Sequence, residues 1–261
     1  VETIGEMLPE DSCVLVDATT MIFHQMQFKQ RRTRDLFLVD LETCCAAAND
    51  LLRMSERAEQ TLVKFQKSSA MSNESILMLE AVTEELIRQY SNDAVYSAQS
   101  VHVFIFEALE NELAGKLFEF EWEDKTHNEM AMTIIRTIED FLQDIAQWMD
   151  DVMVRKSIDA MVKGCVNFYI RHLMLKAAKR GVQVRSSCFQ NNERALRRMA
   201  GDIKIMRDFF ERLVEKFPPL ARIIENEFDV LENVFGLLAV ATELDEAAPE
   251  DFLPVIQRHV R

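Results

Sequence analysis

Apolar residues recur every three or four positions along most of the chain. The longest regular stripe consists of Leu196, Met199, Ile203, Met206, Phe210, Leu213 and Phe217. Two further stripes share this spacing: one runs from Leu41 to Phe65 with a break at Ser55, and one runs from Ile134 to Val152. Such a period places apolar side chains on one face of an α-helix. A stripe of about 20 residues makes a helix about 30 Å long, whose apolar face neighbouring helices have to cover.

The stripes and the breaks between them predict eight helices. Their expected ranges are 10–29, 33–67, 74–117, 127–149, 151–179, 191–217, 220–242 and 249–259, and the third is expected to kink near Ser91–Asp93. Ser72 is a candidate N-cap, and the sequence from Thr126 to Glu129 has the spacing of a capping box. Gly181 follows a basic turn and is expected at the C′ position of a helix. The pair Pro218-Pro219 is expected to end the helix before it.

Residues that form turns are scarce, which supports an all-helical interpretation. The 261 residues include 6 Gly and 5 Pro, too few for the many turns of a β-sheet protein. A hydrophobic content of 48% with 28% charged residues fits stacked amphipathic helices and excludes a disordered chain. We therefore predict an all-α protein, an elongated rod of tandem antiparallel helical bundles. An acidic cluster meets the predicted capping box near residue 125, which predicts one helical bundle over residues 1–125 and a C-terminal helical bundle over residues 126–261.

Neither a membrane span nor a disulfide framework is indicated. The longest apolar stretches, Val101–Phe106 and Val234–Ala241, are much shorter than the roughly 20 residues that cross a bilayer. Glu2 and Glu6 are acidic where a signal peptide is basic. The five cysteines, which have no CxxC spacing, are Cys13, Cys44, Cys45, Cys165 and Cys188. This usage favours a reducing, cytoplasmic setting.

No motif for catalysis or cofactor binding occurs in the sequence. It contains no GxxxxGK[ST], GxGxxG, GxSxG or HExxH. The histidines, which have no histidine partner three or four positions away, are His24, His102, His127, His172 and His259. Metal binding needs convergent ligands, so surface or core roles are favoured for them. Cys44 lies on an apolar stripe, which favours packing over redox chemistry. We expect no enzymatic activity, no metal and no cofactor.

The charge of the chain is unevenly distributed. The net charge is −14, yet residues 155–216 carry 15 Lys/Arg against 6 Asp/Glu, a balance of +9 that leaves −23 for the rest. Seven basic residues gather around one predicted helix end and the start of the next: Lys176, Lys179, Arg180, Arg185, Arg194, Arg197 and Arg198. This basic band has two interpretations, neutralisation by the acidic flanking helices or contact with an acidic protein or anionic membrane. Nucleic acid is not expected, because the whole chain is acidic and the band lacks interleaved aromatic residues.

Four stretches of the sequence resemble a known family in matching order. They are Ala48–Met54, Thr137–Phe141 followed by Asp144, Phe168–Leu173 with its basic link through Arg185, and Ala195–Ile203 leading into Phe209-Phe210. Together they are similar to the C-terminal half of the Sec-six subunit of the exocyst (exocyst complex component three). The resemblance implies a rod of tandem helical bundles without catalytic residues or cofactor.

The same resemblance implies a function and partners. It implies a scaffold that assembles with other exocyst subunits, contacts SNARE or SNARE-regulatory proteins, and tethers secretory vesicles to the plasma membrane before fusion. Two alternatives stay open from the sequence. One is a peripheral membrane-binding helical module that acts through the basic band, and the other is a helical tether of the Munc-thirteen-like class.

Overall fold

The computed structural model describes residues 40–67, 72–178 and 189–243, and every regular element within these ranges is an α-helix. The helices are α3 (Leu41–Gln66), α4 (Asn73–Ser100), α5 (His102–Leu113), α6 (Phe120–Asp124), α7 (Glu129–Trp148), α8 (Asp151–Ala178), α9 (Asn192–Arg212) and α10 (Leu220–Glu243). The predicted helices at 10–29 and 249–259, and the predicted cap at Gly181, lie outside the described residues. The predicted all-α class is confirmed.

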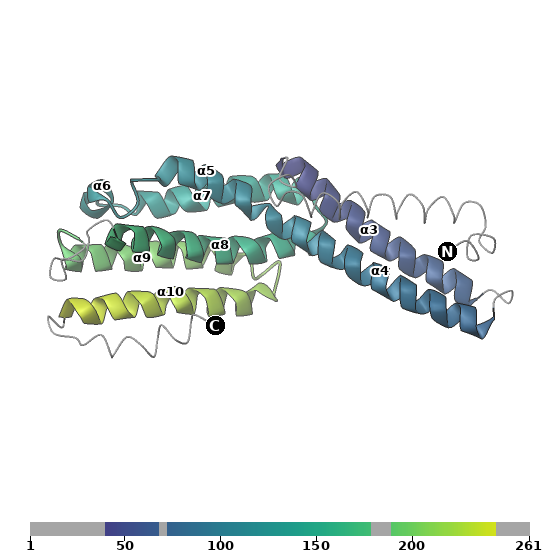
Figure 1. Ribbon diagram of the computed structural model, residues 1–261. Helices are drawn as coiled ribbons and strands as arrows, with labels where there is room; N and C mark the ends of the chain where they lie inside the picture. Colours follow the sequence, from purple (N-terminus) through teal and green to yellow (C-terminus); the bar gives the residue numbers. More distant parts are fainter. Residues whose placement is uncertain (1–39, 68–71, 179–188, 244–261) are drawn as a thin grey trace.

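The helices form an elongated molecule with two parts (Figure 1). Helices α5 and α7 to α10 lie side by side as a bundle, with the short α6 at its far end. Helices α3 and α4 form an antiparallel hairpin that projects from the opposite end of this bundle. The hairpin joins the bundle where α3 packs on α7 and α4 packs on α8. The predicted elongated rod is therefore confirmed for the described residues.

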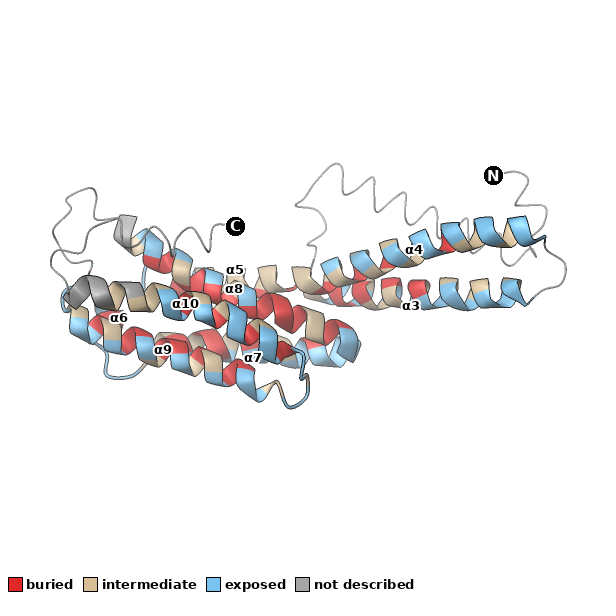
Figure 2. Cartoon of the chain, turned by 90° about the horizontal axis from the view of Figure 1, so that it is seen from below, coloured by how far each residue is buried: buried red, intermediate tan, exposed pale blue. Residues whose placement is uncertain are grey.

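One buried apolar cluster extends through both parts of the molecule, from Cys44 on α3 to Leu231 on α10. Figure 2 shows buried residues concentrated in the bundle and in the half of the hairpin next to it. Met199, Met206 and Phe210 of the longest predicted stripe are all buried. Helices on both sides of residue 125 contribute to this cluster. The division into one helical bundle over 1–125 and a C-terminal helical bundle over 126–261 stays a prediction.

Short polar side chains cap the starts of α3 and α4. Asp40 Oδ1 accepts a hydrogen bond of 2.6 Å from the amide of Thr43 at the start of α3. Ser72 Oγ accepts one of 3.2 Å from the amide of Ser75 at the start of α4. Each cap satisfies an amide that has no partner within its own helix. The predicted N-cap at Ser72 is confirmed.

The predicted capping box at 126–129 is wrong. Helix α7 begins at Glu129, so its N-cap is Asn128, and Thr126 lies too far before the helix to cap it. The Asn128 side chain makes no cap hydrogen bond and reaches α9 instead, where its Nδ2 donates to the backbone oxygen of Arg198 at 2.9 Å. A contact between helices has replaced the local cap.

Three helix boundaries also differ from the prediction. Helix α4 continues without interruption through 91–93, and the break falls at the fully buried Val101 between α4 and α5. The predicted kink is therefore wrong. Ser91, Asn92 and Asp93 fit into a continuous helix, because the residues on either side of them, Tyr90 and Ala94, are buried in the core. After α5 the chain turns through Gly115 (φ 72°) and Phe118 (φ 62°) into the unpredicted α6. Helix α9 ends at Arg212, several residues before Pro218.

Candidate functional site

The hairpin is attached to the bundle through the side chain of Asn49 on α3. Its Nδ2 donates a hydrogen bond of 2.6 Å to the backbone oxygen of Trp148, at the end of α7. Its Oδ1 accepts one of 2.9 Å from the backbone amide of Asp150, just before α8. Asp150 in turn caps α8, because its Oδ1 accepts from the amide of Val152 at 3.0 Å. One amide side chain thus satisfies backbone groups on both sides of the α7–α8 turn and fixes the hairpin against it.

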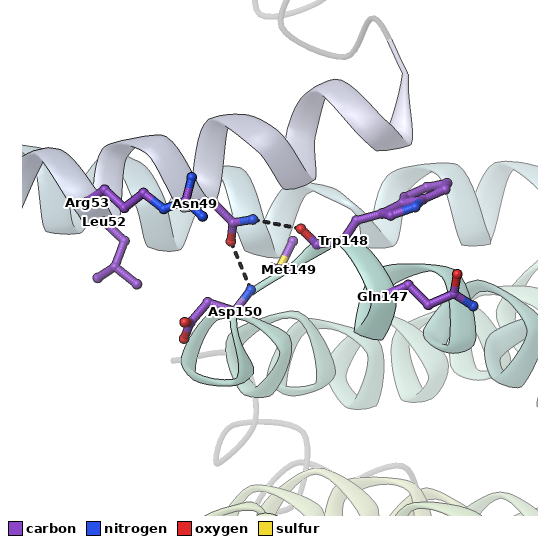
Figure 3. Close-up of a pocket in the computed structure, with 7 residues that line it drawn as sticks. All are labelled: Asn49, Leu52, Arg53, Gln147, Trp148, Met149 and Asp150. Atoms are coloured by element: carbon purple, nitrogen blue, oxygen red, sulfur yellow. Dashed lines mark hydrogen bonds between the residues drawn. The ribbon is translucent and has the colours of Figure 1, made fainter.

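A cavity of about 240 Å³ adjoins this contact (Figure 3). The residues that line it are Asn49, Leu52, Arg53, Gln147, Trp148, Met149 and Asp150. The Trp148 indole points away from Asn49 and is 41% exposed, and the Arg53 side chain is 65% exposed. Trp and Arg are the residue types that most often dominate protein–protein interfaces. Among the residues that line the cavity, no nucleophile is placed beside a base.

Within the described residues, the chemistry of metal binding and thiol catalysis is not found. No group of three His, Cys, Asp or Glu side chains in these ranges is placed to hold a metal ion. Burial raises the pKa of the Cys45 and Cys165 thiols to about 12, so both are neutral near pH 7. Cys44 is buried, as its stripe position predicts. None of the helices in these ranges has an apolar stretch long enough to cross a bilayer.

The structure places four of the seven basic-band residues, and each of the four has a partner within the chain. Lys176, only 12% exposed, forms an ion pair of 2.7 Å with Glu119. Arg198 is buried, and its Nη1 donates to the backbone oxygen of His127 at 2.5 Å. Lys179, Arg180 and Arg185 lie outside the described residues.

The other two described members of the band are exposed. Arg194 pairs with Asp124 at 2.8 Å while its side chain is 52% exposed. Arg197 pairs with Glu193 along α9 at 3.2 Å and is 74% exposed. Exposed ion pairs of this kind contribute little stability and exchange readily for other partners. Arg194 and Arg197 are therefore the described members of the band that can reach another molecule.

A buried polar network at the far end of the bundle was not predicted from the sequence. Its centre is the carboxylate of Asp202 on α9, which is fully buried. Asp202 Oδ2 accepts hydrogen bonds of 2.9 Å from Trp122 Nε1 on α6 and from the Tyr169 hydroxyl on α8. Its Oδ1 accepts one of 2.6 Å from Asn128 Nδ2 at the start of α7. Four elements are tied together by one side chain.

The network alters the acidity of its members. Burial raises the pKa of the Asp202 carboxyl, although the three donated hydrogen bonds and the nearby Arg198 oppose this rise. Burial raises the pKa of Tyr169 well above its ordinary value, and the adjacent Asp202 adds to that rise. The hydroxyl of Tyr169 therefore stays protonated and acts as a donor to Asp202. The arrangement serves to hold helices together.

The sequence carries a signal for the role of Asp202 in its position relative to the apolar stripe of α9. Asp202 follows Met199 by three positions and precedes Met206 by four, so it lies on the apolar face of α9. A carboxylate on such a face must find hydrogen-bond donors on neighbouring elements. No comparable signal in the sequence marks Asn49.

A family model described as "Exocyst complex component Sec6" matches residues 18–255. The chain belongs to this Sec6 family. A search of curated proteins found no match.

A solved Sec6 structure has the same fold. The crystal structure of the C-terminal domain of the exocyst subunit Sec6p matches with a TM-score of 0.65 and 18% sequence identity, over 83% of this chain. This chain spans about half, 49%, of the length of that chain. The predicted membership of the Sec6 family is confirmed.

Three of the residues that join the helices fall within the stretches that carry the resemblance to the Sec6 family. Asn49 lies in Ala48–Met54, and Tyr169 lies in Phe168–Leu173. Asp202 lies in the stretch from Ala195 to Ile203. The helix-face patterns that suggested the Sec6 family thus include three side chains that fix one helix against another.

Proposed function

We propose that this Sec6-family protein is a non-enzymatic scaffold subunit of the exocyst that tethers secretory vesicles to the plasma membrane before SNARE-mediated fusion. The observation that carries this proposal is the match of the Sec6 family model over residues 18–255. The elongated helical fold supports it, because stacked helices hold exposed faces at fixed distances. Helix α4 alone, with 28 residues, is about 42 Å long.

The mechanism that we propose is rigid spacing combined with several separate contacts. Asn49 fixes the hairpin to one end of the bundle, and Asp202 fixes α6 and the start of α7 at the other end. Surfaces at the two ends are then held apart by the helices between them. Contacts that are weak individually become strong together, because binding at one surface raises the effective concentration at the next.

We further propose the partners and the location of the protein. The partners are other exocyst subunits together with SNARE or SNARE-regulatory proteins, and the protein is cytoplasmic and peripheral at plasma-membrane sites of secretion. The exposed Trp148 and Arg53 beside the junction cavity support a protein contact at that position.

A contact between the basic band and an anionic membrane is a second proposal. It is supported by the exposure of Arg194 and Arg197, which lie near the start of α9. It is weakened by Lys176, which is mostly shielded and paired with Glu119, and by Arg198, which is buried in a contact within the chain. If the band binds lipid, the described residues that do so are Arg194 and Arg197.

Affinity purification of the full-length protein from its own cells tests the proposed function. Recovery of the other exocyst subunits in comparable amounts, measured by quantitative mass spectrometry, is the expected result. Recovery of the tagged protein without them contradicts the proposal. Variants at Trp148 and Arg53, both changed to Ala, are expected to lower the recovery of at least one subunit without changing the helical circular dichroism.

A further inference from the structure

The outer half of the α3–α4 hairpin has no third element packed on it in the described part of the chain. Beyond Ser55 on α3 and Thr83 on α4, none of the described side chains toward the hairpin end is buried. Figure 2 shows this end of the hairpin as mostly exposed. Two helices enclose only the seam between them, so their other faces need a further partner if they are apolar.

One of these outer faces is apolar. Leu77, Met78 and Val82 on α4 are 65%, 61% and 55% exposed, and Ala81 between them is also exposed. At 100° per residue these four positions share one side of the helix over little more than one turn. Val63 on the neighbouring α3 is 40% exposed. Single exposed apolar residues are ordinary, but a contiguous group of this kind marks an interaction site.

The same stretch of α4 is acidic. Glu74 lies one turn before Met78, and Glu85 lies one turn after Ala81; both are exposed, as is Glu84. Between Asn73 and Arg88 the helix carries Glu74, Glu80, Glu84 and Glu85 against the single basic residue Arg88. Arg88 is already paired with Glu85 at 2.5 Å. Carboxylates therefore frame the apolar face at both ends, and they complement lysine or arginine.

We propose that this face of α4, from Glu74 to Glu85, is the docking site for an amphipathic helix of another subunit of the assembly. The apolar stripe of the docked helix covers Leu77, Met78 and Val82, and lysine or arginine residues flank that stripe at both ends. A segment of about three turns, roughly 16 Å, is long enough to cover the site. Docking converts the outer hairpin into a local three-helix bundle, in the manner of a helix that lies in an apolar groove. The inference rests on the proposed function in taking the partner as another subunit.

Site-specific photocrosslinking tests the identity of the partner. A photoreactive amino acid replaces Met78 in the full-length protein in its own cells, and the crosslinked peptides are identified by mass spectrometry. The matched control carries the same group at Asn92, which is exposed on the same helix ten residues beyond Val82. The expected result is that the group at Met78 crosslinks to a peptide of another subunit, and that the group at Asn92 does not. This peptide is expected to have an apolar stripe flanked by Lys or Arg residues.

Each other outcome overturns the proposal. A crosslink to residues of this same chain means that the chain covers its own hairpin, and a crosslink to a second copy means self-association. A peptide without basic flanks contradicts the charge argument. A yield at Met78 no higher than at Asn92 shows that nothing docks on this face.

Charge reversal supplies an independent readout. Changing Glu74 and Glu84 to Lys is expected to lower the Met78 crosslink yield at least about fivefold, because the partner's basic flanks then face like charges. The control pair Glu139→Lys and Asp140→Lys, exposed on α7, is expected to leave the yield unchanged.

Affinity purification of the protein from the same cells distinguishes a failure of this inference from a failure of the proposed function. If the exocyst subunits co-purify while Met78 gives no specific crosslink, the docking site fails and the proposed function stands. If no subunit co-purifies, the proposed function fails, and a Met78 crosslink to a protein that is not an exocyst subunit overturns the partner proposed here as well.

Discussion

Trp122 and Asp202 lie 80 residues apart in the sequence, and the indole of the first donates a hydrogen bond of 2.9 Å to the buried carboxylate of the second. Tyr169 donates to the same oxygen, and its ring packs edge-on against Phe118 with 4.8 Å between centroids. Phe118 meets Trp122 in the same way at 4.9 Å. The carboxylate is therefore surrounded by aromatic rings that shield it from water and supply two of its three donors.

Replacing Asp202 by Ala is expected to lower the free energy of unfolding by about 3 kcal/mol, because it leaves the Trp122 and Tyr169 donors buried without an acceptor. Urea unfolding followed by circular dichroism measures the loss. The control is Asp208→Ala, an exposed carboxylate on the same helix, which is expected to change stability by less than about 0.5 kcal/mol. A loss for Asp202→Ala no larger than that of the control contradicts the proposed role of the network.

The pH dependence of stability is expected to show the buried carboxyl as well. Burial raises the pKa of Asp202 above its ordinary value of 3.8, so the folded protein holds this proton more tightly than the unfolded chain does. The protonated carboxyl therefore stabilises the folded protein. This stabilisation is fully present when the pH is below the ordinary pKa of 3.8, and it is lost as the pH rises through the raised pKa. The difference in unfolding free energy between wild type and Asp202→Asn, measured across this range, is expected to fall as the pH rises. A difference that is constant or rises with pH excludes the raised pKa.

The close packing of α5 on α8 is expected to forbid a side chain at Gly164. A Cβ at this position overlaps the Phe106 ring, so Gly164→Ala has to displace a ring that packs against Phe168. We expect a loss of about 1–3 kcal/mol. Gly236→Ala on α10 is the matched control: its Cβ meets nothing within 4 Å, and alanine is expected to stabilise the helix by up to about 1 kcal/mol. Thermal unfolding of both variants checks the opposite signs, and equal shifts contradict the packing argument.

Helices with a continuous apolar stripe could be predicted from the sequence, because their period is local. Met199 and Met206 are buried where that period places them. The contacts between elements could not be predicted, since no period indicates that Asp202 meets Trp122 or that Asn49 meets Trp148. The predicted capping box was wrong for the same reason, because the sequence does not indicate that the side chain of Asn128 contacts Arg198 on α9.

The environment of the residues in the basic band could not be predicted from the sequence either. Its net charge could be counted from the sequence, but which members are buried depends on the fold. Lys176 and Arg198 each meet an acceptor that lies far away in the sequence. Arg194 is paired yet exposed.

Loss of the Asn49 side chain is expected to loosen the hairpin from the bundle. Asn49→Ala removes one donor and one acceptor at the α7–α8 turn, at a cost of about 1–2 kcal/mol. Spin labels at the exposed positions Gln60 on α3 and Glu139 on α7 measure the hairpin–bundle distance in solution. The distance distribution is expected to broaden in Asn49→Ala. It is expected to stay narrow in the control Asp50→Ala, whose side chain is 71% exposed. An unchanged distribution in both variants means that packing alone fixes the hairpin.

Charge reversal at Arg194 and Arg197 is expected to weaken any binding of the protein to anionic vesicles. Each basic residue near an anionic surface contributes about 1 kcal/mol, so the double variant Arg194→Glu and Arg197→Glu is expected to lower the affinity at least tenfold at low salt. Co-sedimentation with phosphatidylserine vesicles, compared with neutral vesicles, measures this loss. The control Arg57→Glu changes an exposed arginine on the hairpin, far from the start of α9, and is expected to bind as the wild type does. If the double variant and the control bind equally well, the described part of the basic band does not contact lipid, and its charges serve the ion pairs with Asp124 and Glu193.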